Sequence, residues 1–355
     1  PGRSGHKLSI ETAASVYECR KVLSNFFGAK GPECVIFALN CTHAINMVMK
    51  GLLKTGDHVV TSCLEHNSVA RPLKNLKNTR GVSYSQAEVF WGDDERTTLS
   101  FLKKINKKTK LIACLHASNV WGTKLPIEKL TDLAHSFGVQ ILVDAAQTAG
   151  VFSINFKKTP IDYLCVPGHK GLYGPMGIGI LVTECGGNLD TILQGGTGTS
   201  SISLQQPNDE PEKFESGTLN VPGILGLKSG VDFVNKISIK KIAEHENNLM
   251  LRMYEGLKEC KAVKLYTNKP NISYSAPIIS FNVLDKKSEE VSYFLDKYEV
   301  YVRSGLHCAP LAHNFFKTTA QGAVRISPSF FTTKRDIDRA LKLIKKFTKA
   351  AHSRR

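Results

Sequence analysis

The sequence predicts an α/β protein, with a largely parallel sheet in its first two-thirds and a smaller α+β domain after it. Two observations predict this architecture. Six short apolar runs, several of them rich in Val and Ile, have the length of buried strands. Stretches with helical spacing and polar faces lie between many of these runs, as in a sheet covered by helices on both sides. The 355 residues are enough for about two domains.

The six runs are predicted to be strands of one sheet. They are CVIFA (34–38), DHVVTS (57–62), KLIACLH (110–116), VQILVD (139–144), DYLCV (162–166) and GIGILVT (177–183). Residues 42–53 and 126–137 have apolar residues at helical spacing and are predicted helices between strands. We expect these elements to form a large domain over residues 1–228.

The rest of the chain predicts a second domain. Residues 197–222 are rich in Gly, Ser, Thr, Pro and acidic residues, which indicates a long functional loop and not a core element. Residues 276–284 form a predicted strand. Two helices are predicted around it, one with Ile242, Leu249, Met253 and Leu257 on one face and one with Ile337, Leu341 and Ile344. These elements predict an α+β domain over residues 229–355.

Charge and composition narrow the possible partners and compartments. The net charge is +16, and residues 339–355 contribute seven Lys and Arg with no acidic residue. Such a segment can bind nucleic acid, but the pattern favours the solvated face of a terminal helix, and we predict no nucleic-acid partner. No apolar stretch is long enough to span a membrane, and the first residues lack the pattern of a secretory signal. We therefore expect a soluble, cytoplasmic protein.

The cysteines do not predict a disulfide framework or a metal site. Their number, nine, is odd, they are scattered along the chain, and no CxxC pair is present. We expect most of them to be small buried apolar residues.

Polar side chains follow the predicted strands, at the sheet edge where parallel α/β proteins bind ligands. This set comprises Thr42, His43, His66, Asn119, Asp144, His169 and Lys170. A lysine and an aspartate at this edge match the needs of pyridoxal phosphate, which a lysine binds covalently and whose ring nitrogen a carboxylate keeps protonated. Backbone N–H groups of Thr42, His43 and Ala44, at the start of a helix, are suited to the phosphate.

Motifs along nearly the whole chain carry a resemblance to a known family. They are GRSGHKLS, LEHNS, SNVWGTKLPI, VDAAQTAG, PGHKGLYGPMGIGIL, FESGTLN, RSGLHCAP and VRIS. The GHK segment, which lies some 25 residues after VDAAQ, is highly specific. On these motifs the sequence resembles the class V aminotransferase-like enzymes of fold type I, and within them the group II cysteine desulfurases and selenocysteine lyases.

The resemblance implies a role for each site residue. Lys170 would bind pyridoxal phosphate covalently, Asp144 would pair with its ring nitrogen, and His66 would stack on the ring. Asn119 and Gln147 would bond the phenolic oxygen, Arg325 would clamp the substrate carboxylate, and Asn119 would also contact the substrate. Thr42, His43 and His169 would contact the phosphate together with Thr218 from the partner subunit of a homodimer, and His6 would contact the substrate.

Cys308 narrows the possible reactions of such an enzyme to those that transfer sulfur. It lies in RSGLHCAP, a turn-rich segment that predicts an exposed loop, and Arg303 and His307 are candidate cations that would activate its thiol. The resemblance implies that Cys308 takes sulfur from cysteine as a persulfide and passes it to a sulfur-acceptor protein.

The sequence departs from the family at two points. Pro167 occupies the position where many desulfurases have a phosphate-binding Ser, so one hydroxyl and one N–H are missing. The family's first strand and NAATT-like segment do not precede PGRSGH here, and we expect a late start or a truncation.

Our functional hypothesis is a pyridoxal-phosphate-dependent cysteine desulfurase that acts on a small amino acid. Three alternatives remain open at this point. One is selenocysteine lyase, another is a different class V enzyme, and the third is a non-catalytic basic interaction protein with the same fold. The presence of both Lys170 and Asp144 argues against the third.

Overall fold

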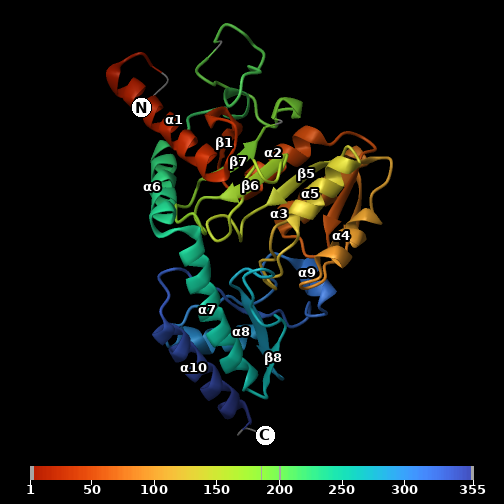
Figure 1. Ribbon diagram of the computed structural model, residues 1–355, viewed down its shortest axis with the longest axis vertical. Helices are drawn as coiled ribbons and strands as arrows, with labels where there is room; N and C mark the ends of the chain where they lie inside the picture. The colour runs from red at the N-terminus through yellow and green to blue at the C-terminus, as the bar shows by residue number, and fades with distance from the viewer. Residues whose placement is uncertain (1–3, 185, 200, 353–355) are drawn as a thin grey trace.

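The computed structural model describes residues 4–184, 186–199 and 201–352, which form a larger upper part and a smaller lower part (Figure 1). The upper part contains a seven-stranded sheet of order β1-β7-β6-β5-β4-β2-β3. Its strands are β1 (Val35–Ala38), β2 (His58–Ser62), β3 (Ser83–Ala87), β4 (Thr109–Leu115), β5 (Gln140–Asp144), β6 (Tyr163–Pro167) and β7 (Gly179–Thr183). β7 pairs antiparallel with both of its neighbours, β1 and β6, and the other four strand pairs of this sheet are parallel. The prediction of a mainly parallel α/β fold is confirmed.

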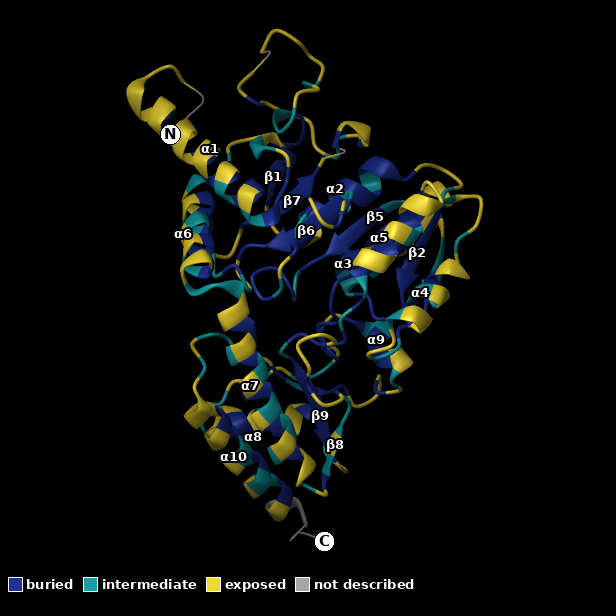
Figure 2. Ribbon diagram, in the orientation of Figure 1, coloured by how far each residue is buried: buried dark blue, intermediate teal, exposed yellow. Residues whose placement is uncertain are grey.

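The apolar runs form strands because both faces of the sheet are covered. Every residue of β1, β2, β6 and β7 is buried (Figure 2). Along β5, Ile141 and Val143 belong to the core on one face, and Leu142 belongs to the core on the other. Successive side chains of a strand point to opposite faces, so an unbroken apolar run serves both cores at once.

Six helices cover this sheet among the described residues. They are α1 (Lys7–Phe27), α2 (Cys41–Leu52), α3 (Asn67–Arg80), α4 (Asp94–Leu102), α5 (Ile127–Ser136) and α6 (Val221–Ile237). Helices α2 and α3 pack into one core, through residues such as Ile45 and Leu73, and α1, α5 and α6 pack into the other. Short 3-10 helices at Pro32–Cys34, Gly186–Asn188 and Glu212–Phe214 complete this part.

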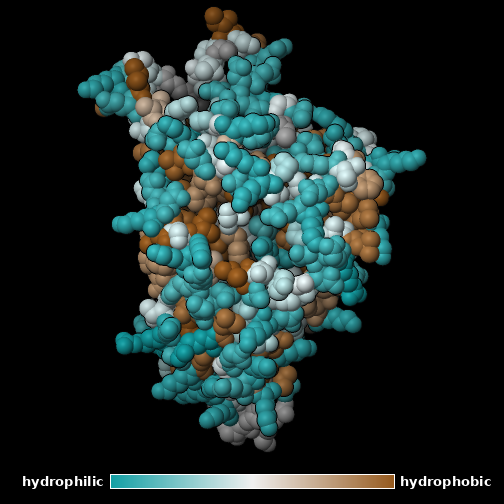
Figure 3. Space-filling model, viewed as in Figure 1, coloured by the Kyte–Doolittle hydropathy of each residue, from teal (hydrophilic) through white to brown (hydrophobic). Residues whose placement is uncertain are grey.

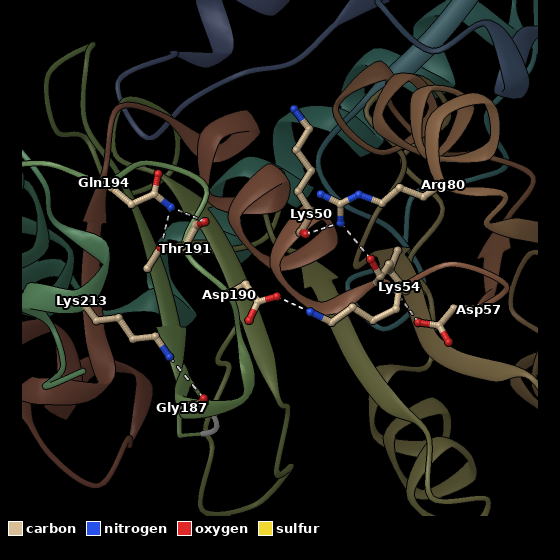
Figure 4. Close-up of polar contacts among 10 residues, drawn as sticks. Lys50, Lys54, Asp57, Arg80, Gly187, Asp190, Thr191, Gln194 and Lys213 are labelled. Carbon is tan, nitrogen blue, oxygen red and sulfur yellow. Dashed lines mark hydrogen bonds and ion pairs between the residues drawn. The ribbon is translucent and has the colours of Figure 1, made fainter. Parts of the chain in front are cut away.

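The C-terminal end of α2 is fixed by polar contacts (Figure 4). The Arg80 guanidinium donates hydrogen bonds to the carbonyl oxygens of Lys50 (2.7 Å) and Leu53 (2.9 Å), which lie where a helix leaves carbonyl groups unpaired. Next to them, Lys54 forms an ion pair with Asp190. These contacts connect the C-terminal end of α2 to α3 and to the segment that follows β7.

The segment predicted as a loop is largely irregular, and its second half is anchored in the core. Glu215 is buried and forms an ion pair with buried Arg20 of α1. Arg20 also lies over the Phe37 ring, 4.4 Å from its centroid. The polar composition of the segment did not reveal this anchor, which requires an arginine almost two hundred positions away in the sequence. This ion pair therefore fixes the part of the segment that precedes Thr218.

The lower part contains a three-stranded antiparallel sheet of order β10-β9-β8. Its elements are α7 (Ile239–Lys258), β8 (Val263–Leu265), β9 (Ile279–Val283), α8 (Ser288–Asp296), α9 (Pro310–Phe315), β10 (Val324–Ile326) and α10 (Lys334–His352). The basic helix α10 packs on α7 and α8 and buries Ile337 and Ile344 in the core of the lower part. The boundary expected between residues 228 and 229 lies inside α6, and the division into two domains stays a proposal. No helix in the described ranges has the length and apolar character needed to cross a membrane.

Candidate active site

A cavity of about 180 Å³ lies at the edge of the large sheet, beyond the ends of β4, β5 and β6. It brings together seven of the predicted site residues from separate parts of the sequence. Its lining is Asn40, Cys41, Thr42, His66, Ser68, Leu115, Ala117, Asn119, Asp144, Ala146, Gln147, Pro167, His169 and Lys170. The sheet edge therefore collects the polar residues, as the strand pattern predicted.

Asp144 is the last residue of β5 and its side chain is 5% exposed. One carboxylate oxygen accepts hydrogen bonds from the Ala146 N–H (2.9 Å) and the Cys41 thiol (3.5 Å). The other oxygen accepts a bond from the Ser68 hydroxyl at 3.3 Å. These three donors are neutral, so they orient the carboxylate and leave its charge for a cationic ligand group.

Lys170 lies in the turn after β6 and faces the same cavity. Burial lowers the pKa of its ammonium group, although the Asp144 carboxylate acts in the opposite direction. The turn fits closely against the segment after β5, because a Cβ on Gly150 would lie 1.9 Å from the Gly171 carbonyl oxygen. Glycine at position 150, where φ is 84°, therefore allows the Lys170 turn and the Asp144 strand to approach each other.

His66 and Asn119 border the cavity from the segments that follow β2 and β4. His66 precedes α3, and its Nδ1 accepts a hydrogen bond from the Ser68 N–H at 3.0 Å. Burial lowers the pKa of the His66 ring, which favours a neutral imidazole. The Asn119 amide donates to the His307 carbonyl oxygen at 2.8 Å, while its Oδ1 is buried without a hydrogen-bond partner.

Arg325 lies on β10 of the lower part and is connected to the site by a hydrogen bond to Asn119. Its guanidinium donates to the Asn119 carbonyl oxygen at 2.8 Å, and its Nε is buried without a partner. Burial lowers the pKa of Arg325 to about 10, and the nearby Arg303 charge acts in the same direction. An anionic ligand would relieve both effects, which fits a carboxylate-binding role.

Cys308 is exposed, as predicted, and lies in a strained turn. His307 and Cys308 both have positive φ, at 50° and 57°, a conformation that non-glycine residues adopt at a cost. The Arg303 guanidinium lies 3.6 Å from the Cys308 sulfur, which confirms the predicted neighbouring cation. The prediction for His307 is wrong. Its ring is buried and bonded to the Ala323 carbonyl oxygen, and burial lowers its pKa to about 3.

Cys308 borders a second, outer groove of about 390 Å³. The groove and the inner cavity share Thr42, His66 and Ser68 in their walls. The exposed thiol therefore lies just outside the cavity that contains Lys170 and Asp144.

The other described cysteines differ from Cys308. They are Cys19, Cys34, Cys41, Cys63, Cys114 and Cys165, which are buried, and Cys260, which is partly buried. Burial raises the pKa of each of these seven thiols. All eight described cysteines are free thiols.

Five predicted site residues do not line the cavity: Arg325 and Cys308, described above, and His43, His6 and Thr218. His43 lies in the first turn of α2, where its Nδ1 accepts a bond from the Leu39 N–H at 3.2 Å. His6 is the N-cap of α1 and accepts a bond from the Ser9 N–H at 3.2 Å. Thr218 is exposed in the segment before α6. Their predicted contacts stay predictions.

Two residues in contact with Asp144 were not predicted, namely Cys41 and Ser68. Each is close to a predicted site residue: Cys41 lies directly before Thr42, and Ser68 lies two positions after His66. Their role depends on the meeting of α2, α3 and β5, which local sequence does not show.

The cavity fits pyridoxal phosphate on the donors that it presents. Burial favours the neutral amine of Lys170, the Asp144 carboxyl group is oriented by the Ala146 N–H, and the buried Asn119 Oδ1 has no protein partner. The N-terminal end of α2, with Asn40, Cys41 and Thr42 in the cavity wall, is suited to a phosphate. Pro167 also lines the cavity and supplies no hydroxyl or N–H there. The fold and this site together define a pyridoxal-phosphate enzyme on a mainly parallel sheet.

Comparisons with known proteins agree with this class. The profile of the aminotransferase class-V family matches residues 1–340. A probable cysteine desulfurase from Pyrococcus abyssi is 33% identical over 359 residues, which cover 99% of this chain and 88% of that protein. The chain belongs to the aminotransferase class-V family.

Solved structures extend the comparison to three dimensions. An apo structure of a cysteine desulfurase from Thermococcus onnurineus is 34% identical, with a TM-score of 0.90 over 98% of this chain and 87% of that one. A cysteine desulfurase structure from Escherichia coli, 22% identical, shares the fold with a TM-score of 0.86 over 98% of this chain and 86% of that one. The predicted family, fold type I and dependence on pyridoxal phosphate are confirmed.

Proposed function

We propose that the protein is a cysteine desulfurase, which converts cysteine to alanine and transfers sulfur to Cys308. The observation that carries this proposal is the exposed thiol beside Arg303, immediately outside the cavity of Lys170 and Asp144. An enzyme that acted only at the substrate α-carbon would have no use for a second nucleophile there. The similarity to cysteine desulfurases supports the same reaction.

The residues of the cavity have different roles in the reaction at the substrate α-carbon. Bound pyridoxal phosphate supplies a conjugated ring that accepts the electron pair left behind by the α-proton. Arg325 binds the substrate carboxylate through its guanidinium. Lys170 Nζ takes the α-proton, for which burial prepares it by favouring the neutral amine. With the cofactor bound, Asp144 would pair with its ring nitrogen and His66 would contact its ring.

Cys308 carries out the transfer of sulfur from the substrate. Its thiolate sulfur bonds to the substrate sulfur as the substrate carbon–sulfur bond breaks, which leaves a persulfide on Cys308. The carbon skeleton keeps the electron pair of the broken bond, takes up protons and leaves as alanine. The Arg303 guanidinium lies 3.6 Å from this sulfur, so its positive charge is close to the attacking atom during the transfer.

Replacement of Cys308 by alanine tests this function. We expect alanine formation from cysteine to fall about 100-fold, because the sulfur loses its nucleophile. Cofactor binding should stay unchanged, since Cys308 does not line the inner cavity. Selenium leaves carbon more readily than sulfur, so turnover of selenocysteine should survive much better. The measurements are alanine release from each substrate and mass spectrometry of the parent enzyme after turnover.

Two results would contradict the proposed sulfur step. One is a persulfide on a different cysteine of the parent, and the other is an unchanged rate with cysteine in the Cys308→Ala variant. Efficient turnover of selenocysteine, with almost none of cysteine, by the parent enzyme would favour the alternative of a selenocysteine lyase.

The enzyme is proposed to act as a homodimer in which Thr218 of a second copy completes the phosphate site. In support, Thr218 is exposed on an anchored segment and does not line the cavity of its own chain. Ile202 and Leu204, in the same stretch of chain, are fully exposed, and apolar side chains appear at the tip of the segment that projects at the top of the molecule (Figure 3). Exposed apolar surface of this kind is typical of an interface.

The dimer proposal predicts complementation between two variants that each lack one residue of the shared site. A mixture of Lys170→Ala and Thr218→Ala chains should form some dimers in which one site has both native residues. Such a mixture should regain up to about a quarter of the parental activity after subunit exchange, since closed dimers share their interface by symmetry. A sedimentation experiment that finds active monomers would contradict the proposal.

The outer groove is proposed to admit a sulfur-acceptor protein. Lys50, Arg71 and Cys308 line it, and its lining has no acidic residue. An acceptor thiol on an acidic segment would therefore be attracted to the persulfide.

We further propose the cytoplasm as the compartment, since the eight described cysteines are free thiols and a reducing environment maintains such groups.

A further inference from the structure

Glu65 is a fully buried acid that the proposed reaction does not use. Its side chain is 0% exposed, and it lies between the end of β2 and His66. One carboxyl oxygen, Oε1, accepts hydrogen bonds from the Ser62 hydroxyl and from the Leu115 N–H (3.1 Å). The other oxygen, Oε2, is buried without a hydrogen-bond partner. Both donors are neutral groups, so the burial of a negative charge here is not compensated by a cation.

The Glu65 carboxyl group links the ends of β2 and β4 beyond their last paired residues. We call this place the junction of the two strands. The two strands pair only as far as Thr61 and Ala113, whereas β4 continues to Leu115. On its other side, Leu115 still pairs with Asp144 of β5. The Leu115 N–H would have no strand partner on the β2 side, and Glu65 supplies the missing acceptor.

The residues just beyond this junction face the cofactor cavity. His66 follows Glu65 directly, Asn119 follows Leu115 by four positions, and Leu115 itself lines the cavity. A shift between the ends of β2 and β4 would therefore move His66 and Asn119 relative to each other.

We propose that Glu65 is a positioning residue held as a neutral carboxylic acid, which joins the ends of β2 and β4 and thereby fixes His66 and Asn119 in the cofactor cavity. This inference rests on the proposed roles of His66 and Asn119, but the protonation of Glu65 can be tested without them. The neutral state also keeps a second negative charge away from Asp144, whose charge the ring nitrogen requires.

The surroundings favour the neutral acid. Burial raises the pKa of Glu65 to about 8; the two hydrogen bonds oppose this effect, and the Asp144 charge adds to it. The other titratable groups that face Glu65 are the thiols of Cys63 and Cys114, which burial keeps protonated at neutral pH. Glu65 therefore carries a proton through the acidic and neutral range.

The pH dependence of stability tests the protonation state. The pKa of Glu65 rises on folding from the ordinary 4.5 to about 8, so the wild type loses stability as pH increases between these values. Glu65→Gln keeps the Oε1 acceptor and has no proton to lose. Its melting temperature should therefore increase relative to the wild type from pH 5 to pH 8 and then stay level.

The control is Glu88→Gln, at an exposed position. Its melting temperature should differ from that of the wild type by the same amount at every pH. The inference of a neutral acid would be overturned if Glu65→Gln also differed from the wild type by a constant amount.

Cofactor titration of the unloaded chain tests the positioning role. Glu65→Leu removes both hydrogen bonds and should weaken pyridoxal-phosphate binding about tenfold, with a shifted visible absorption band. Glu65→Gln should bind as the wild type does. Because Glu65→Leu could fail to fold, Glu65→Asp serves as a second variant, which keeps the acid but is too short to reach Leu115. It should lose affinity in the same way.

Two outcomes would overturn the positioning role. If Glu65→Gln is as impaired as Glu65→Leu, the site requires a charge at this position. If Glu65→Leu and Glu65→Asp both bind like the wild type, the junction does not affect the cavity. Neither measurement uses alanine formation, so failure of the proposed desulfurase activity would remain distinguishable from failure of this inference.

Discussion

Replacement of Lys170 by alanine is expected to abolish covalent attachment of pyridoxal phosphate and to lower alanine formation at least about 1000-fold. Lys170 is the lysine that lines the inner cavity, and it is assigned both the attachment and the removal of the α-proton. Borohydride reduction of the loaded enzyme followed by peptide mapping measures the attachment. In the parent, the label should appear on the peptide that contains Lys170.

Lys74→Ala provides the matched control, because Lys74 is exposed on α3 and does not line either cavity. It should retain both the label and the activity. A parental label on any other lysine would refute the assignment of Lys170.

Replacement of Asp144 by asparagine should slow exchange of the substrate α-proton about 1000-fold, the scale expected when a buried charge partner is lost. Asparagine has nearly the same shape and can keep part of the hydrogen bonding to Ala146 and Ser68. It lacks the negative charge that holds a proton on the ring nitrogen. Nuclear magnetic resonance in deuterated water measures the exchange directly.

Asp132→Asn, at an exposed position on α5, is the control and should exchange at the parental rate. Near-parental exchange in Asp144→Asn would show that another group supplies the charge. Loss of exchange in both variants would point to a general effect of the substitutions on folding.

The strands of the large sheet were predictable because burial on both faces demands unbroken apolar runs. β3 was missed, since its sequence, SYSQA, is polar and its first four residues are exposed or half-buried. It lies at the edge of the sheet, where one side needs no strand partner and little apolar surface is buried. An edge strand forms by hydrogen bonding to its one neighbouring strand, which for β3 is β2.

The site was predictable where a residue follows a strand within a motif, as Asp144 and Lys170 do. It was not predictable where the environment comes from distant elements. His307 belongs to a segment rich in turn residues, and nothing local reveals that its ring is buried against the Ala323 carbonyl oxygen. Glu65 lies inside a recognised motif, but its partner Leu115 is fifty positions away.

The contrast between the cysteines has a consequence for the fidelity of sulfur delivery. The outer sulfur of a persulfide can pass to any thiolate that reaches it, and Cys41 lies in the wall of the neighbouring cavity. Burial and the Asp144 charge raise the pKa of Cys41 well above its ordinary value, so this thiol stays protonated and a poor acceptor. The remaining internal thiols are protected in the same manner. Sulfur held on Cys308 therefore has an outlet toward the solvent and none toward the core of the described chain.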